Sequence, residues 1–366
     1  MAARRPPELN SGILSDTVIR HFPFENVNQT SVLQLVSYED RNYYFVGTLE
    51  GQSTTDEFIF KISNTRACLD LIDGQNAVMN HLKKRGIPCT YPLASRQREY
   101  SIVVSSSDLQ FTTDISEFTF CVRVFPYLQG NLLNSVKVTE QLLRCVGKFV
   151  GTMDKAIEGF AHPAIEACLN GWDLRNFPDA KKYLYAVDDL NKIAMVTKVF
   201  EYFSEHIEPM IPSLRHRIIH GDCNEQNILL CGVQEGPYEV SGILDFGDCV
   251  YSCLVFNLAI LLTYIMLLMV DDDPLQYAAP VIQAYQEVLP LEPCELQLLY
   301  YCVLVRICLS VLIGAHSYIQ DPSNNIYQLC TQKCGWKLLK ILLDTPKEEV
   351  DRLWCKEDHH ITNVLQ

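Results

Sequence analysis

The sequence has 366 residues, of which 48% are hydrophobic and 20% are charged, and its formal net charge is −14. One hydrophobic core rarely serves a chain of this length, so we expect two lobes. The apolar content excludes an intrinsically disordered chain. The negative charge disfavours general binding to nucleic acid or to anionic membrane surfaces, because both require basic patches. The sequence identifies no protein partner.

Cysteine usage predicts a cytoplasmic protein. The 15 cysteines are odd in number, and no apolar signal region follows the first residues, MAARRPPELN. In a reducing compartment such cysteines stay free thiols. The pairs Cys249/Cys253 and Cys330/Cys334 lack a second Cys/His pair at zinc-site spacing, so we expect no metal–thiolate site.

The chain is rich in β-prone runs before about residue 125. One helical pattern at residues 67–85 interrupts them and stops at Gly86 and Pro88. We therefore predict an antiparallel sheet carrying one helix, with strands at 32–36, 43–49, 57–62, 101–104 and 118–124.

After residue 130 the pattern is mostly helical, apart from a strand-rich island at 217–250. The predicted helices lie at 139–157, 181–190, 196–206, 274–288, 294–318 and 325–343. The uncharged run at 253–270 also meets the length of a membrane span, about 18–20 residues. Because it contains polar side chains and is followed by three aspartates, we favour a buried core helix over a membrane span.

Two polar motifs occur in the strand-rich island: HGDCNEQN at 220–227 and ILDFGD at 243–248. The turn-forming segment between them predicts a hairpin that brings Asn227 and Asp245 to the same end. An Asp, four residues, an Asn and a later Asp-Phe-Gly match the phosphoryl-transfer template. We therefore predict that Asp222 is the catalytic base and that Asn227 and Asp245 bind Mg²⁺. The alternative is that all three are ordinary cap and turn residues.

The same template requires a phosphate-binding lysine in the sheet. Lys61 lies within the apolar run FIFKI and is our candidate, although an exposed edge strand would also explain a lone lysine. The following helix should supply an acidic partner. Gln75 stands at the expected position and is not acidic, so the partner is either Asp73 or none.

No glycine-rich loop precedes the candidate lysine. The turn SYEDRNY at 37–43 would cover the phosphates, with Arg41 as a candidate contact, although a solvated turn is the simpler alternative. In the joint at 124–130, Phe125 and Tyr127 are candidates for contact with the nucleotide base, and packing is the alternative.

Residues 220–230 and 242–248, Lys61 and the joint at 123–130 resemble the aminoglycoside phosphotransferase and choline-kinase-like small-molecule kinases, over about residues 30–345. The resemblance implies an α+β, protein-kinase-like two-lobed fold, a GTP or ATP donor and Mg²⁺. We expect an N-terminal extension at 1–28, a nucleotide-binding N-lobe at 29–123, a hinge at 124–130, a catalytic and substrate-binding C-lobe at 131–346 and a C-terminal tail at 347–366.

Within that family, GWDL at 171–174, the two catalytic motifs and LEPCEL at 291–296 look most like the hydroxylysine kinases. This likeness implies transfer of the γ-phosphate of GTP to the 5-hydroxyl of hydroxylysine. Two departures stand out. Asn257 replaces an Asp that the family commonly carries in Asp-Leu-Ala, and Gln75 replaces the expected acid.

A hydroxylated diamino acid needs both anionic and cationic contacts. We predict Asp248 and Asp173 for the ammonium groups, with Trp172 stacked on one of them. Arg306, in an apolar helix, is the candidate for the carboxylate. A helix-capping role for Asp173 and a structural ion pair for Arg306 are the alternatives. We expect His220 to be a structural residue rather than a base.

Other functions are compatible with these motifs. The chain could phosphorylate another amino alcohol, such as choline, ethanolamine or an aminoglycoside. The two departures also leave open a nucleotide-binding pseudokinase that acts as a scaffold, and the apolar run leaves open a membrane protein.

Overall fold

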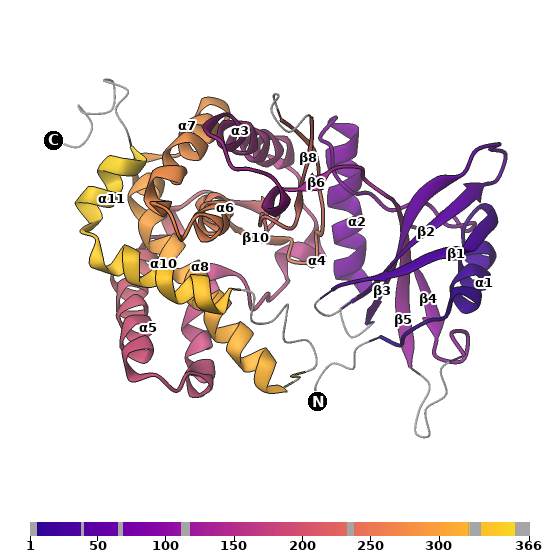
Figure 1. Cartoon of the computed structure of the whole chain (residues 1–366), viewed down its shortest axis with the longest axis horizontal. Helices are drawn as coiled ribbons and strands as arrows, with labels where there is room; N and C mark the ends of the chain where they lie inside the picture. Colours follow the sequence, from indigo (N-terminus) through magenta and orange to yellow (C-terminus); the bar gives the residue numbers. More distant parts are fainter. Residues whose placement is uncertain are drawn as a thin grey trace. The chain divides into compact units, whose positions relative to one another are not determined.

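The computed structural model describes residues 6–37, 40–64, 69–110, 118–232, 238–320, 322 and 331–355 (Figure 1). The chain forms two compact units. Unit 1 comprises Met1–Gln129 with His162–Ala164, and unit 2 comprises Gly130–Ala161 with Ile165–Gln366. Among the described residues, unit 1 holds a sheet with two helices, where the sequence predicts one, and unit 2 is mostly helical, as predicted.

Unit 1 is built on a five-stranded antiparallel sheet with the strand order β1-β2-β3-β5-β4. Its strands are β1 (Phe24–Leu35), β2 (Arg41–Leu49), β3 (Asp56–Asn64), β4 (Ile102–Ser105) and β5 (Thr119–Pro126). Strand β1 begins well before the predicted position at residue 32, and β5 continues to Pro126. The predicted hinge at 124–130 therefore starts inside a strand.

The N-terminal segment belongs to the core of unit 1. Helix α1 (Ser11–His21) begins at Asn10, whose side chain accepts a hydrogen bond from the N–H of Ile13. Its buried face, with Leu14 and Val18, joins the apolar cluster of the sheet. Over its described residues, 6–28, the segment expected to be an N-terminal extension is thus part of unit 1, because its apolar side chains pack in the core of the sheet.

Helix α2 (Leu69–Lys84) follows β3, close to the predicted range. The chain leaves it at Gly86, whose φ of +75° is the left-handed conformation that glycine adopts without strain.

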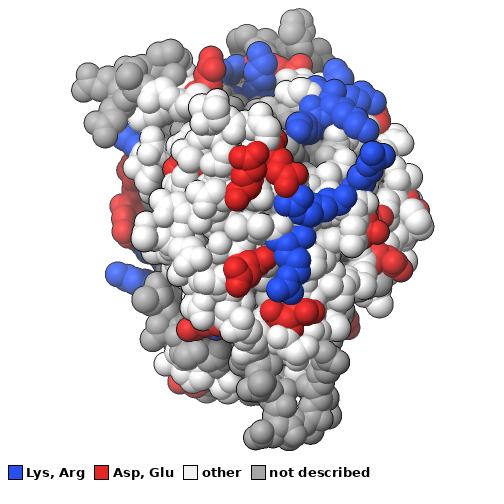
Figure 2. Space-filling model, turned by 90° about the vertical axis from the view of Figure 1, so that its right-hand side faces the viewer, with Lys and Arg blue, Asp and Glu red and all other residues white. Residues whose placement is uncertain are grey.

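The molecular face shown in Figure 2 carries a band of Lys and Arg beside patches of Asp and Glu. The net negative charge is therefore not spread evenly over the surface.

Unit 2 contains most of the helices. Their bounds are α3 (Glu140–Ile157), α4 (Pro163–Glu166, which starts in the unit 1 segment), α5 (Leu190–Tyr202), α6 (Leu254–Leu268), α7 (Ala278–Val288), α8 (Pro293–Gln320), α10 (Gln332–Asp344) and α11 (Lys347–Trp354). The predicted helix at 181–190 is wrong in type, because residues Leu174–Ala186 form a 3₁₀ helix that contains Pro178. Helix α11 buries Val350 and Trp354 against unit 2, so the predicted tail starts as part of that unit.

Helix α6 is the core of unit 2, and every residue from Leu254 to Met266 is buried. This burial confirms the core-helix interpretation of the apolar run. Within the described ranges, one helix, α8, has the length and composition needed to cross a membrane. Of its most apolar stretch, 83% is buried inside the protein.

Two small sheets of unit 2 hold the predicted motifs. Strand β7 (His216–Ile219) pairs with β10 (Val250–Cys253), and β8 (Ile228–Cys231) pairs with β6 (Asn131–Leu132) and β9 (Glu239–Ile243). The loop at 220–227 runs from β7 to β8, and the loop at 244–249 runs from β9 to β10. Since each loop connects the same two sheets, the loops lie side by side.

Candidate active site

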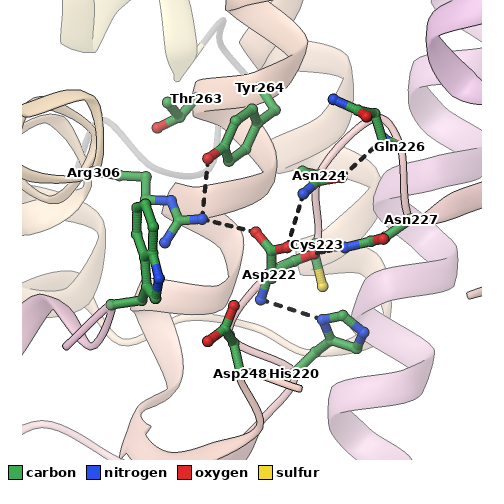
Figure 3. A network of polar contacts seen from close by, with 12 residues as sticks. His220, Asp222, Cys223, Asn224, Gln226, Asn227, Asp248, Thr263, Tyr264 and Arg306 are labelled. Atoms are coloured by element: carbon green, nitrogen blue, oxygen red, sulfur yellow. Dashed lines mark hydrogen bonds and ion pairs between the residues drawn. The ribbon is translucent and has the colours of Figure 1, made fainter. Parts of the chain in front are cut away.

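Asp222 is the centre of a polar network in unit 2 (Figure 3). Its Oδ1 accepts a hydrogen bond from Nη2 of Arg306 at 2.7 Å. Its Oδ2 accepts from Nδ2 of Asn224 at 2.8 Å and from Nδ2 of Asn227 at 2.9 Å. The carboxylate is thus held in one orientation by contacts from its own loop and from α8.

His220 connects the two loops. Its Nε2 lies 2.9 Å from the carbonyl oxygen of Leu244, and its Nδ1 lies 3.2 Å from the amide N–H of Asp222. The Leu244 carbonyl requires a proton on Nε2, so Nδ1 is the acceptor. Complete burial lowers the pKa of His220, which favours this neutral form. Both ring nitrogens are used, as expected for a structural residue.

Gly221 has a geometric reason to be glycine. Its φ is +78°, and a Cβ at this position would lie 2.3 Å from the carbonyl oxygen of Asp248. The two loops therefore approach too closely for any side chain here. This contact places Asp248 next to Asp222.

Asn227 and Asp245 lie at the same end of the β8–β9 hairpin. The pair Ile228 and Ile243 is in register, and the N–H of Leu244 donates to the carbonyl of Asn227 at 2.8 Å. The hydrogen bonds that hold the Asn227 side chain use Nδ2, which leaves its amide oxygen as the atom suited to a cation. Asp245 is exposed, and its φ of +51° is rare outside glycine.

These two oxygen donors suit a hard divalent cation whose other ligands are phosphate oxygens and water. When bound, such a cation would neutralise charge on the phosphates. The chain itself contributes the position of both oxygens, through the hairpin register and the left-handed backbone of Asp245.

Asp248 lies beside Asp222 in Figure 3. Its Oδ1 accepts from Nδ2 of Asn170 at 3.0 Å. Burial, followed by the charge of Asp222, raises the pKa of Asp248 to about 7, and the Asn170 hydrogen bond opposes this rise. A cationic ligand nearby would favour its ionised form.

Arg306 extends from α8 and is 2% exposed. Its Nη2 donates to Asp222 and to Oη of Tyr264, at 2.7 and 3.0 Å. The guanidinium carbon lies 5.1 Å from the Trp172 ring centroid and 5.2 Å from that of Tyr264. Its Nε and Nη1 are buried and have no partner in the part of the chain that the structure describes. Two unpaired donors of a buried cation are costly unless a ligand accepts from them.

Trp172 and Asp173 have different surroundings from those predicted. Trp172 is half-buried and lines a small pocket with Asp248 and Gly221. Asp173 instead caps the 3₁₀ helix Leu174–Ala186 and accepts from Arg175 and from Oγ of Ser252, with its side chain 1% exposed. The structural alternative therefore accounts for Asp173, and we no longer assign it an ammonium group.

Lys61 lies in unit 1, on β3. Its Nζ forms an ion pair with Asp40 at 2.8 Å. Asp73, the predicted partner, lies 3.8 Å from Nε2 of His162 instead. A carboxylate does pair with Lys61, but it comes from the β1–β2 turn rather than from α2. Sequence spacing on the helix could not reveal it.

Helix α2 presents amides to a different cation. Nη1 of Arg123, on β5, donates to Oε1 of Gln75 at 3.3 Å and to Oδ1 of Asn76 at 3.2 Å. Arg123 and Lys61 are direct partners in the β3–β5 register. A neutral amide suffices at Gln75 because it accepts from an arginine that was not part of the prediction.

The other predicted nucleotide contacts fall on unit 1 as follows. Nε of Arg41 donates to the carbonyl of Pro6, and its Nη1 pairs with Glu8 at 2.9 Å, so the N-terminal segment occupies this guanidinium. Phe125 is buried, 5% exposed, while Tyr127 is 37% exposed and packs edge-on against Tyr44. Of the two aromatic residues, Tyr127 is the one with an accessible ring.

Sequence reasoning missed several residues of the network. Tyr264 and Asn170 contact Arg306 and Asp248, and Glu225 has a buried oxygen, Oε2, with no partner in the described part. Glu225 and Asn224 were visible as polar residues of the catalytic motif. Tyr264, on α6, and Asn170, in the loop after α4, lie outside the two motifs, and the tertiary fold brings them to the site.

A model of the phosphotransferase enzyme family matches residues 32–295. The chain belongs to this family. It is also 32% identical to hydroxylysine kinase of Mus musculus over 89% of this chain and 88% of that protein. It is 30% identical to hydroxylysine kinase of Danio rerio over 98% of both chains. The recognition from the motifs is thus confirmed.

Solved structures confirm the fold class. The chain is similar to a microcompartment-associated aminopropanol kinase, with a TM-score of 0.68, 14% identity and coverage of 92% of this chain and 98% of that one. It is also similar to amicoumacin kinase, with a TM-score of 0.62, 15% identity and 92% coverage of both. The protein is a phosphotransferase with an alcohol group as acceptor, and its family uses a nucleoside triphosphate donor.

Proposed function

We propose that this phosphotransferase transfers the γ-phosphate of GTP to the 5-hydroxyl of 5-hydroxy-L-lysine, in the breakdown of that amino acid, with Mg²⁺ bound. The observation that supports this acceptor is Arg306, a buried guanidinium beside the predicted base whose Nε and Nη1 have no partner among the described residues. A carboxylate of the acceptor would accept a charge-assisted hydrogen bond from this guanidinium. The relatives named hydroxylysine kinase support the same acceptor, and GTP rests on that resemblance.

In this proposal Asp222 orients the acceptor hydroxyl and takes its proton late in the transfer. Lys61 neutralises the α- and β-phosphates, and Asn227 and Asp245 hold Mg²⁺ on the triphosphate. Positioning and electrostatics contribute most of the rate, since the transition state requires little covalent help. Asp248 binds an ammonium group of the acceptor, with Trp172 as its neighbour. Tyr127 contacts the nucleotide base.

The 13 cysteines in the described ranges are free thiols, which supports a reducing compartment, and we propose the cytoplasm. The departure at Asn257 does not favour a scaffold. Its Oδ1 still accepts from the N–H of Gly221 at 3.2 Å.

An acceptor panel tests the proposed function. Hydroxylysine, choline, ethanolamine and an aminoglycoside would each be assayed with GTP and with ATP, and kcat/KM compared. We expect hydroxylysine with GTP to exceed the other pairs by about 100-fold or more, because an acceptor that leaves buried polar groups unpaired is strongly rejected. Preference for choline or an aminoglycoside would contradict the acceptor. Nucleotide binding without any transfer would indicate a scaffold.

Replacing Arg306 with Lys tests the carboxylate contact. Lysine keeps the charge but lacks the planar fork. The ratio of kcat/KM for hydroxylysine to that for its methyl ester should be high in the wild type and fall by about tenfold or more in the variant. The ester is the matched control, because any effect of the substitution on Asp222 acts on both acceptors. An unchanged ratio would place the carboxylate elsewhere.

The pH dependence of acceptor binding tests Asp248. Its carboxyl, with a pKa of about 7, is mostly neutral at pH 6 and mostly ionised at pH 8. The acceptor's side-chain ammonium, with a pKa of about 10.4 as in lysine, stays charged throughout. KM for hydroxylysine should therefore fall by about tenfold between pH 6 and pH 8. Asp248→Asn should raise KM and remove this dependence. A variant that keeps the wild-type profile would exclude Asp248 as the ammonium site.

A further inference from the structure

A second buried network of hydrogen bonds contacts the catalytic loop at 220–227 through helix α6. Asn257, on α6, is fully buried. Its Oδ1 accepts from the N–H of Gly221 at 3.2 Å and from Sγ of Cys223 at 3.5 Å. These two residues flank Asp222, so the Asn257 amide holds the backbone N–H of the residue before the base and the side chain of the residue after it. The resemblance to the small-molecule kinases implies an Asp at this position, and the amide lacks its charge.

The carboxylate of this network comes from another helix. Asp154, on α3, is fully buried, and its Oδ1 accepts from Nδ2 of Asn257 at 2.7 Å. Its Oδ2 accepts from Oη of Tyr285, on α7, also at 2.7 Å. Asp154 touches neither the base nor the metal ligands. Its connection to the loop runs through Asn257.

Two glycines on α3 allow this arrangement. A Cβ at Gly147 would lie 2.4 Å from the carbonyl oxygen of Val281, and one at Gly151 would lie 3.0 Å from that of Tyr285. Helices α3 and α7 can therefore approach closely, and Asp154 follows on the same face of α3. The approach brings the Tyr285 hydroxyl within hydrogen-bonding distance of Asp154.

We propose that Asp154 is a positioning residue of the phosphotransferase: it fixes the orientation of the Asn257 amide and so holds the loop that carries Asp222. The oxygen of Asn257 must face the N–H of Gly221, which requires an acceptor opposite its nitrogen. Asp154 is that acceptor. The carboxylate that the resemblance implies on α6 is thus supplied by α3. The proposal rests on phosphotransfer by this chain and is independent of which acceptor it uses.

The donors and acceptors around Asp154 and Asn257 predict that the Asp and the Asn can swap positions only if both are substituted together. In Asp154→Asn, one amide oxygen would have to serve both Tyr285 and Asn257, so one donor is left without an acceptor. In Asn257→Asp, two carboxylates face each other. In the double variant, the new carboxylate at position 257 would accept from Gly221 and from the new amide at position 154, whose oxygen would accept from Tyr285. Every donor then has an acceptor.

The experiment compares Asp154→Asn, Asn257→Asp and the double exchange with the wild type. Asp16→Asn, at an exposed position of α1, is the control for loss of a carboxylate. We expect each single exchange to lower kcat by about tenfold or more, with KM for the nucleotide changed by less than about twofold, and the double exchange to recover to within about threefold of the wild type. Turnover would be measured on the preferred acceptor.

Hydrogen exchange gives a readout that does not depend on the acceptor. Deuterium uptake by peptides that cover Gly221 and Cys223 should rise in Asp154→Asn and return toward the wild type in the double exchange. If the proposed acceptor were wrong, this result would still hold. If Asp154 were only a packing residue, the double exchange would not restore protection.

Asn257→Asp should also change the pH dependence. Burial raises the pKa of Asp154 to about 7 in the wild type, against the hydrogen bonds from Tyr285 and Asn257. In the variant the facing carboxylates need one shared proton, so kcat at saturating acceptor should fall more steeply than in the wild type as the pH rises from 6 to 8. The other titratable groups around Asp154 are Tyr285, Arg217 and Cys223, all present in the wild type. The double exchange removes the pair and should lose this pH dependence.

Two results would overturn the proposal. One is a double exchange that is as impaired as the single ones, or that fails to fold. The other is Asp154→Asn with wild-type turnover and wild-type exchange at Gly221. If Asp154→Asn alone does not fold, Asn257→Asp and the double exchange decide by the same comparison.

Discussion

Asp222→Asn is expected to lower kcat by about 10²- to 10⁴-fold, the usual contribution of a general base, while nucleotide affinity stays near the wild-type value. The substitution removes the group that accepts the proton of the hydroxyl. Nucleotide affinity should persist because Lys61, Asn227 and Asp245, the proposed contacts to the triphosphate, are unchanged. Steady-state kinetics would report kcat, single-turnover kinetics would report the chemical step, and calorimetric titration with a non-hydrolysable nucleotide would report affinity.

The local geometry calls for a second variant at this position. Oδ2 of Asp222 accepts from Asn224 and Asn227, and Oδ1 accepts from Arg306. An asparagine at 222 must turn its own N–H groups toward one of these sets of donors, which could shift the loop. Asp222→Ala removes the base without adding a donor. Both variants should show the same loss, and turnover near the wild-type rate in either one would remove Asp222 from the mechanism.

Asp245→Asn should have the second large effect, a loss of about 10²- to 10³-fold in kcat/KM, comparable to the removal of one electrostatic contact to a transition state. Asparagine tolerates the left-handed backbone that Asp245 adopts, so the fold of the loop should be kept. The loss then reports the missing charge. Mg²⁺ titration should show a higher half-saturating concentration in the variant.

A control variant at Asp245 separates the effect of the lost charge from the effect of strain in the backbone. Asp245→Ala would add strain in the left-handed region, because alanine is disfavoured there. It should therefore lower the melting temperature as well as the rate, whereas Asp245→Asn should lower only the rate. Unchanged Mg²⁺ dependence in Asp245→Asn would show that this carboxylate is not a metal ligand.

Two parts of the molecule show how a family pattern can be kept with different residues. The carboxylate that pairs with Lys61 comes from Asp40 in a turn, and the carboxylate behind the catalytic loop comes from Asp154 on α3. In each case an amide stands where the resemblance implies an acid: Gln75 accepts from Arg123, and Asn257 accepts from the N–H of Gly221. Reading either amide as evidence of a dead enzyme would overlook the relocated charge.

Short-range patterns in the sequence predict the local features of this protein. The hairpin register that aligns Asn227 with Asp245, the burial of α6 and the helix α2 all follow from short-range patterns of apolar and turn residues. These patterns are set by the backbone periodicity of helices and strands, which acts within a few residues.

The pairings between residues far apart in the sequence depend on how the helices and strands pack. It assigned Asp173 to a helix cap, placed Arg306 against Asp222, paired Lys61 with Asp40 and joined Asp154 to Asn257. A buried polar group needs a partner, but many side chains could provide one, and which one does depends on how helices and strands pack. That choice is made by contacts between segments remote in sequence, where no periodic pattern carries the information.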